Sequence, residues 1–254
     1  MNVFFVGAGP GDPELITVKG QRLLGQADVI IYAGSLVNPA LLSLAKNGAA
    51  IYNSALMTLD EVIAVMERAA AENKLVVRLH TGDPSIYGAI QEQMDALAAK
   101  NITFEVIPGV SSFLATAAAL KQEYTLPDVS QTVIITRLEG RTPVPEKEKL
   151  AKLASHEATM CIFLSVHILD NVVKELIDGG YTPDTPVAIV QKASWPDQKI
   201  FRGTLAAIAQ IAKDNHIDRT AMIVVGKVLG SDYALSRLYA PEFGHMFRQA
   251  QEAR

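Results

Sequence analysis

The chain has one cysteine, one tryptophan and no strong excess of charge, and these shortages exclude whole classes of protein. Cys161 stands alone in the apolar run Thr159–Leu164, so no internal disulfide can form. We interpret it as a buried structural thiol, which fits the reducing environment of the cytoplasm. A net charge of −4 over 254 residues argues against a general binder of nucleic acids or membrane surfaces.

Several other signals are missing. No apolar run approaches the length of a membrane span. Val3–Val6 leads directly into glycines, without the basic and long apolar regions of a secretory signal, so a cytoplasmic protein is expected. Histidine and cysteine are not spaced as a metal cluster, and no nucleophile elbow or Gly-Lys-Ser/Thr phosphate loop occurs. We therefore expect no bound metal and no hydrolase triad.

The residues that are present favour a globular α/β protein. Hydrophobic residues make up 49% and charged residues 20% of the chain, and its length suits two modest domains. Strand-like and helix-like segments alternate, which predicts two α/β domains with mostly parallel sheets. The connector Lys121–Asp128 predicts a boundary between an N-terminal domain, 1–121, and a C-terminal domain, 122–254. The C-terminal domain ends in a polar tail from Ser231, to which no role is assigned.

A glycine-rich loop, Gly7–Pro13, directly follows the predicted strand Asn2–Val6. Glycines allow a ligand to approach the backbone and supply amide donors. The loop differs from a dinucleotide-binding loop because Asp12 replaces the third glycine. The second predicted strand also ends at 32–34 without the acid that would bind a ribose. A simple tight turn would account for the same sequence.

Two further loops, His80–Pro84 and Pro108–Ser112, also follow predicted strands. Asp83 before a proline predicts a helix over 84–100, and either serine of the second loop can cap a helix, so capping alone would explain these residues. His80 is a candidate partner for a carboxylate, a proton acceptor, or a structural residue. Three such loops at one edge of a sheet favour a ligand site.

Two segments of the second half carry cations or an aromatic ring. The stiff, proline-containing loop 136–146 holds Arg137 and Arg141, which would suit recognition of carboxylates or a solvated surface. The segment Lys192–Asp197 holds the sole tryptophan, Trp195. Its ring can pack beneath the loop or offer a flat face to a planar ligand.

Taken in order, the five segments resemble the tetrapyrrole methylase family, from Asn2 to about Gly230. The stretches 6–13, 82–84 and 108–109 resemble the family at large. The stretches 32–37, 78–84, 136–143 and 192–197 resemble its members that methylate C11 of precorrin-4 or cobalt-precorrin-4. The resemblance implies a homodimeric enzyme of cobalamin biosynthesis that holds S-adenosyl-L-methionine in a cleft between two α/β domains.

The resemblance also implies a set of site residues. Contacts to the cofactor, many through the backbone, are expected at Pro10, Gly82, Asp83, Ile86, Ser111, Ser112, Leu164, Ala193 and Ala221. Ala193 stands where some relatives have glycine. The substrate is a polycarboxylate and needs compensating cations when it leaves water. The candidates for binding it are Arg78, His80, Arg137, Arg141 and Lys192.

The implied chemistry depends on alignment. Because the sulfonium methyl group is already activated, holding it in line with an electron-rich ring carbon can supply about 7–11 kcal/mol. No catalytic residue is assigned, and His80 is the one weak candidate for a base.

Other functions stay open. These are methylation of another ring position, methylation of a protein or RNA, a nicotinamide oxidoreductase, and a non-catalytic tetrapyrrole carrier. The charge balance disfavours a nucleic-acid target, and the departures from the dinucleotide-binding pattern disfavour the oxidoreductase. Whether the substrate contains cobalt is also open.

Overall fold

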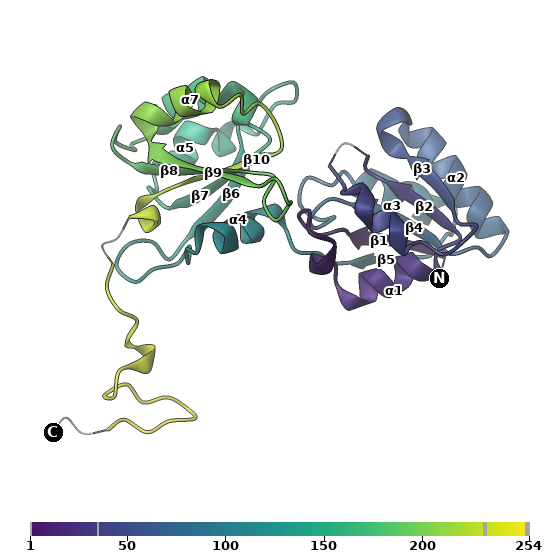
Figure 1. Cartoon of the computed structure of the whole chain (residues 1–254), viewed down its shortest axis with the longest axis horizontal. Helices are drawn as coiled ribbons and strands as arrows, with labels where there is room; N and C mark the ends of the chain where they lie inside the picture. Colours follow the sequence, from purple (N-terminus) through teal and green to yellow (C-terminus); the bar gives the residue numbers. More distant parts are fainter. Residues whose placement is uncertain (1, 35, 231–232, 252–254) are drawn as a thin grey trace. The chain divides into compact units, whose positions relative to one another are not determined.

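The computed structural model describes residues 2–34, 36–230 and 233–251, and the chain divides into two compact units. The first unit runs to Ala119 and regains Lys192–Lys199 from the second half of the chain. The second unit comprises Leu120–Gln191 and the residues from Ile200 onward. The predicted boundary after residue 121 lies close to the division after Ala119. The sequence does not predict that residues 192–199 belong to the first unit. Figure 1 labels most of the helices and strands.

The first unit is built on a five-stranded sheet in the order β3-β2-β4-β1-β5. All four pairs of neighbouring strands are parallel. The strands are β1 (Val3–Gly7), β2 (Val29–Tyr32), β3 (Ala50–Asn53), β4 (Val76–His80) and β5 (Phe104–Ile107). Every residue of β1 and β4 is buried, as expected for central strands covered on both faces.

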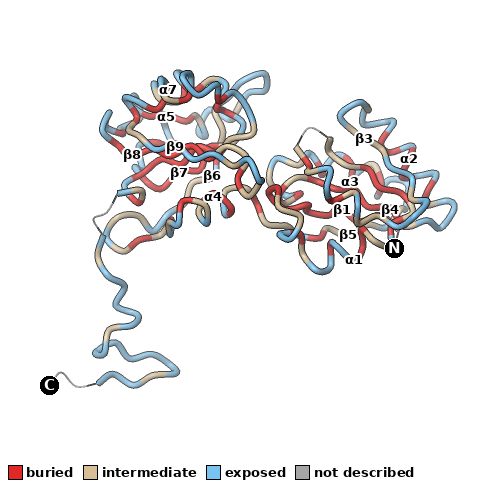
Figure 2. The backbone as a smooth tube through the Cα atoms, viewed as in Figure 1, coloured by how far each residue is buried: buried red, intermediate tan, exposed pale blue. Residues whose placement is uncertain are grey.

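Helices cover both faces of this sheet because successive side chains of a strand point to opposite sides. One face packs on α1 (Val18–Gln26), and the other packs on α2 (Leu59–Ala71) and α3 (Gln91–Ala99). A further helix, α4 (Ser112–Leu120), follows β5. Figure 2 shows the buried backbone concentrated along the strands.

The predicted helix over 84–100 begins later than expected, at Gln91. Tyr87 and Ala89 have φ angles of 55° and 49°, which are incompatible with a right-handed helix. A Cβ on Gly88 would lie 2.0 Å from the carbonyl oxygen of Pro84, so the chain turns tightly here. The Asp83-Pro84 pair therefore starts a turn and not a helix.

The second unit contains a mixed sheet in the order β6-β7-β10-β8-β9. Its strands are β6 (Val133–Arg137), β7 (Thr159–Phe163), β8 (Pro186–Gln191), β9 (Lys199–Thr204) and β10 (Ala221–Val225). Strands β6 and β7 are parallel, whereas β10 is antiparallel to both β7 and β8. The α/β class is confirmed. The prediction of mostly parallel strands is correct for the first sheet and wrong for β10, because alternation of strands and helices does not report strand direction.

One face of the second sheet packs on α5 (Leu150–Ala154), α6 (Leu169–Asp178) and α7 (Leu205–Asp214). Cys161 lies in β7 and is fully buried, which confirms the prediction of a buried thiol. Its burial raises the pKa of the thiol to about 12, so it stays protonated. Short 3₁₀ helices occupy Pro13–Leu15, Pro39–Leu44, Ser54–Leu56, Glu146–Glu148, Val166–Ile168, Lys227–Leu229 and Arg237–Tyr239.

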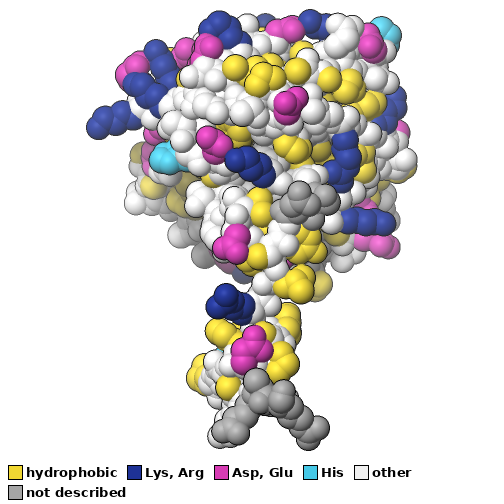
Figure 3. Space-filling model, turned by 90° about the vertical axis from the view of Figure 1, so that its left-hand side faces the viewer, with side chains coloured by type: hydrophobic (Ala, Val, Ile, Leu, Met, Phe, Trp, Pro, Cys, Tyr) yellow, Lys and Arg dark blue, Asp and Glu magenta, His cyan; other side chains and the backbone are white. Residues whose placement is uncertain are grey.

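The C-terminal segment 233–251 is less polar than predicted. The guanidinium group of Arg248 donates to the carbonyls of Leu238, Ala240 and Phe243 at 2.8–2.9 Å. Four large apolar side chains of this segment are more than 80% exposed, and Figure 3 shows hydrophobic side chains along it. They are Leu235, Tyr239, Met246 and Phe247. Within the described ranges, no helix is long and apolar enough to span a membrane.

Candidate functional site

Three loops meet at the edge of the first sheet where its parallel strands end, here called the carboxyl edge. The ends of β1 and β4 are level, because Gly7 pairs with His80. Beyond them, the amide of Gly82 donates to the carbonyl of Gly9 at 2.8 Å, and the amide of Gly9 donates to the carbonyl of Gly82 at 3.3 Å. The first two predicted loops are therefore joined by their backbones.

Asp83 joins the third loop to this pair. One carboxylate oxygen accepts from the amide of Ser85 at 2.8 Å, and the other accepts from the amide of Gly109 at 2.9 Å. A Cβ on Gly109 would lie 2.2 Å from the carbonyl oxygen of Gly82 and 2.8 Å from the Cα of Gly7. Only glycine fits at 109, and the Asp83 carboxylate holds it in place.

The remaining predicted residues of the first unit lie along the same loops. Ser111 is buried, and its carbonyl accepts from the amides of Leu114 and Ala115. Ser112 is the first residue of α4, and the amide of Ile86 donates to the carbonyl of Asp83. The structure thus brings the three predicted loops together at one edge.

Arg78 and His80 lie behind this edge, on the strand face that packs against α2 and α3. Arg78 is 6% exposed and donates to the Gln93 side-chain oxygen at 3.1 Å and to the Ile31 carbonyl at 3.2 Å. Burial lowers its pKa to about 10. Its donors and its burial count against direct contact with substrate carboxylates.

His80 is 4% exposed and neutral at pH 7. Burial, and then the charge of Arg78, lower its pKa to about 3. Its Nε2 atom has no hydrogen-bond partner among the described residues, and its ring lies 6.1 Å from that of Phe5. A neutral imidazole cannot compensate a carboxylate, so the burial of His80 argues against its predicted part in substrate binding.

In the second unit, strand direction decides which residues share an edge. Ala221 begins β10 and does not end it, but the antiparallel register pairs it with Gln191, the last residue of β8. Because β7 is antiparallel to β10, Leu164, the residue after the end of β7, lies at the edge where β10 begins with Ala221. Leu164 is 57% exposed and has a φ angle of 56°. The predicted contacts Leu164 and Ala221 therefore share one edge.

The predicted cationic side chains of the second half differ in whether they are bonded to other groups or exposed. Arg137 donates to the carbonyls of Thr142 at 3.2 Å and Pro143 at 2.8 Å, so it organises its own loop. Lys192 pairs with Asp197, and its Nζ lies 5.7 Å from the centroid of the Trp195 ring. Of the five residues predicted to bind substrate, only Arg141 is exposed.

The segment 192–199 contacts the first glycine-rich loop. Trp195 Nε1 donates to the carbonyl of Pro10 at 3.0 Å, and the amide of Asp12 donates to the hydroxyl of Ser194 at 3.0 Å. Sequence reasoning missed these contacts because the partners are 185 and 182 residues apart. Of the two interpretations of Trp195, the structure shows packing against a loop.

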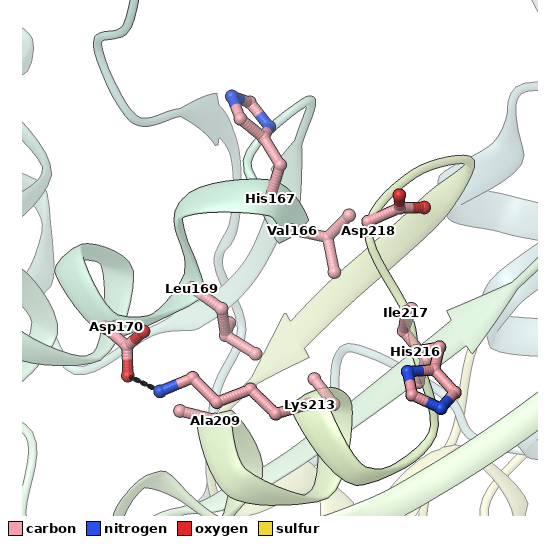
Figure 4. Close-up of a pocket in the computed structure, with 10 residues that line it drawn as sticks. Val166, His167, Leu169, Asp170, Ala209, Lys213, His216, Ile217 and Asp218 are labelled. Atoms are coloured by element: carbon pink, nitrogen blue, oxygen red, sulfur yellow. Dashed lines mark hydrogen bonds and ion pairs between the residues drawn. The ribbon is translucent and has the colours of Figure 1, made fainter.

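A pocket of about 320 Å³ in the second unit contains none of the predicted residues (Figure 4). It lies between the start of α6 and the end of α7, where Lys213 pairs with Asp170 at 2.8 Å. Across the described residues, no group of three or more His, Cys, Asp or Glu side chains could hold a metal ion.

The model of the family Tetrapyrrole (Corrin/Porphyrin) Methylases matches residues 2–209. The chain belongs to this family. Its relatives include the cobalt-precorrin-4 C(11)-methyltransferase of Methanocaldococcus jannaschii, which is 61% identical over 98% of this chain and 97% of its own. The precorrin-4 C(11)-methyltransferase of Pseudomonas aeruginosa is 47% identical over 99% of this chain and 100% of its own.

Solved structures of other tetrapyrrole methylases share the fold. A cobalt-precorrin-4 methyltransferase of cobalamin biosynthesis has a TM-score of 0.89 and 50% identity, covering 91% of this chain and 96% of its own. The uroporphyrin-III C-methyltransferase of Thermus thermophilus, complexed with S-adenosylhomocysteine, has a TM-score of 0.75 and 29% identity, covering 90% of this chain and 93% of its own.

Proposed function

We propose that this tetrapyrrole methylase transfers a methyl group from S-adenosyl-L-methionine to C11 of cobalt-precorrin-4 or precorrin-4 in cobalamin biosynthesis. The observation that carries the proposal is the 61% identity, over nearly the whole chain, to the cobalt-precorrin-4 C(11)-methyltransferase of M. jannaschii. That identity exceeds the 47% identity to the precorrin-4 C(11)-methyltransferase of P. aeruginosa, whose name carries no cobalt. The difference favours the cobalt-containing substrate for this chain.

The carboxyl edge of the first unit fits the cofactor chemically. The adenosyl and amino-acid groups of the cofactor need hydrogen-bond donors and acceptors together with close backbone approach. Gly9 and Gly82 have φ angles of 76° and 63°, a conformation open to glycine, and they leave the loop without side chains there. The buried Oγ1 of Thr81, next to Gly82, has no partner among the described residues. These features support a site for a small polar ligand.

The residues proposed to hold the cofactor are Pro10, Gly82, Asp83, Ile86, Ser111, Ser112, Leu164, Ala193 and Ala221. The cofactor supplies a methyl group already activated by a positive sulfur. The protein then needs to fix the loops and align the acceptor carbon, which can supply about 7–11 kcal/mol. The rigid Asp83–Gly109 contact serves that alignment.

Substrate binding would fall to the exposed cation of the 138–143 loop. Arg141 lies in a loop shaped by the bonds from Arg137 to Thr142 and Pro143, and its fork suits a carboxylate. The proposal includes function as a homodimer in the cytoplasm, for which gel filtration with light scattering gives the test of assembly.

The first experiment is calorimetric titration of the purified protein with S-adenosylhomocysteine, with NADH as a parallel control. Micromolar binding of the former and none of the latter is the expected result. Methyl transfer to precorrin-4 with and without cobalt would then be followed by mass spectrometry. Binding of NADH alone would replace the proposal with an oxidoreductase. Binding of the tetrapyrrole without a methylated product would indicate a carrier.

A further inference from the structure

The segment 192–199 forms a compact turn that is closed by its own bonds. The amide of Trp195 donates to the carbonyl of Lys192, and the amide of Gln198 donates to the carbonyl of Trp195, each at 3.0 Å. The Gln198 side-chain oxygen accepts from the amide of Ser194 at 2.8 Å. Lys192 and Ser194 take positive φ angles of 51° and 69°. The turn therefore has a defined shape, from which Ser194 and Trp195 reach the first glycine-rich loop.

Three consecutive residues of that loop are each held by a side chain from elsewhere in the first unit. Trp195 holds the carbonyl of Pro10, and Ser194 holds the amide of Asp12, both at 3.0 Å. Between them, the side-chain amide of Asn38 donates to the carbonyl of Gly11 at 2.7 Å. A loop of glycines has much backbone freedom to lose, so external bonds of this kind set its conformation.

The indole ring lies directly on Gly11. A Cβ at this position would be 2.0 Å from Cδ1 of Trp195 and 2.1 Å from its Nε1. The φ angle of Gly11 is not in the left-handed region, unlike that of Gly9, so the ring itself, and not the backbone angle, requires glycine here. Gly11 and Trp195 are therefore a matched pair.

We infer that Trp195 is a positioning residue for the methyl transfer: its indole fixes the backbone of Pro10–Asp12 in the conformation that receives the cofactor. This inference rests on the proposed function. The same turn carries Ala193, so the docked indole holds two predicted cofactor contacts, Pro10 and Ala193, in a fixed relation. In the chain, the turn directly follows β8 and leads into β9.

The test compares S-adenosylhomocysteine affinity, by calorimetry, in full-length variants. Trp195→Phe keeps a flat ring and loses the bond to Pro10, so we expect about tenfold weaker binding. Gly11→Ala should weaken binding by more than tenfold, because its methyl group displaces the ring. In the double variant Gly11→Ala/Trp195→Ala the clash is gone, so binding should be no weaker than in Trp195→Ala alone. Gly25→Ala, in α1, is the control and should bind as wild type, because its new Cβ would lie 3.4 Å from the carbonyl oxygen of Leu44, an ordinary contact distance.

A purely structural role predicts a different pattern. It would lower the melting temperature of the Trp195 variants but leave the affinity of the folded fraction unchanged, and that result would overturn the inference. Ser194→Ala removes only the bond to the amide of Asp12, so it should fold even if the Trp195 variants do not. This variant should still weaken binding of S-adenosylhomocysteine several-fold. In turnover assays, the KM for S-adenosylmethionine should rise in Trp195→Phe while the KM for the tetrapyrrole stays the same.

The fluorescence of the sole tryptophan separates this inference from the proposed function. Without any ligand, Gly11→Ala should shift the emission of Trp195 to longer wavelength and increase its quenching by acrylamide. An unchanged spectrum would show that the ring does not sit on Gly11, and would overturn the inference whether or not the cofactor binds. A shifted spectrum in a protein that binds no S-adenosylhomocysteine would confirm the docking but remove both the proposed function and the positioning role.

Discussion

The two sheets of this methylase assemble their edges in different ways. In the first sheet all strands are parallel, so every strand end delivers its loop to one edge, and the loops bond to one another through backbone groups and glycines. In the second sheet β10 runs against its neighbours, so the start of one strand lies beside the ends of others. The loops at the edge of a parallel sheet can be predicted from where each strand ends. For a mixed sheet, the direction and pairing of each strand must also be known.

The two edges also differ in what occupies them. The first is made of tightly packed backbone, with its charged side chains buried or bonded, as for Arg78 and Asp83. The second presents the exposed Leu164 and, in the loop after β6, the exposed Arg141. We therefore expect substitutions at the first edge to affect folding and cofactor affinity together, and substitution of the exposed Arg141 to affect substrate binding with little effect on folding.

The largest effect should come from Gly109→Ala. Its new Cβ would lie 2.2 Å from the carbonyl oxygen of Gly82, and both partners are backbone, so the loops must separate. We expect a loss of about 3 kcal/mol in the free energy of unfolding, measured with urea, and no measurable cofactor binding. Gly140→Ala, whose Cβ would have no neighbour within 4 Å, is the matched control in the second unit and should change neither. Equal stability of the two variants would contradict the contrast between the edges.

Asp83→Ala removes the acceptor that holds the Gly109 amide. A hydrogen bond to a charged group contributes about 1.5–3 kcal/mol, so affinity for S-adenosylhomocysteine should fall by roughly ten- to a hundredfold. Asp60→Ala, on the exposed start of α2, serves as the control. Wild-type affinity in Asp83→Ala would show that the third loop keeps its place without the carboxylate.

His80 should make the stability of the first unit depend on pH. Its folded pKa, about 3, lies below the ordinary value of 6.5, so the unfolded chain binds the proton first. Stability is then fully present above pH 6.5 and is lost as the pH falls toward 3, by at most about 1.4 kcal/mol per pH unit. Urea unfolding at pH 7.5, 6 and 5 should show a smaller loss for His80→Gln than for the wild type. Equal losses of unfolding free energy in the two proteins would show that His80 does not cause the pH dependence.

The smallest effect on stability is expected at Arg141. Because its side chain is exposed, Arg141→Ala should leave unfolding unchanged while raising the KM for the tetrapyrrole several-fold, with the KM for S-adenosylmethionine constant. Steady-state kinetics at low and high salt measures this, since screening should reduce the difference. Lys147→Ala, an exposed cation nearby, is the control. An equal rise of the KM for the tetrapyrrole in Lys147→Ala would indicate a general effect of positive charge and not a specific contact of Arg141.

The sequence predicts the three loops of the first edge because each follows a strand and parallel strands end together. It does not predict the bond between Asp83 and Gly109, or that between Trp195 and Pro10, because their partners meet only in the folded chain. It places Arg78 on a strand but puts His80 in the loop that follows, whereas His80 is the last residue of β4, and it does not report which helices cover that face. The direction of β10, and with it the position of Ala221 beside the last residue of β8, likewise depends on pairing.

The return of Lys192–Lys199 to the first unit has a consequence for the order in which the protein is made. Once the ribosome has synthesised the chain as far as Ala119, every strand of the first sheet has been made, but Trp195, whose indole covers Gly11, has not. The nascent first unit can form its sheet early, yet its glycine loop remains uncovered until most of the second sheet has been synthesised. A fragment ending at Ala119 would keep that uncovered loop permanently, so no single cut in this chain yields two complete units.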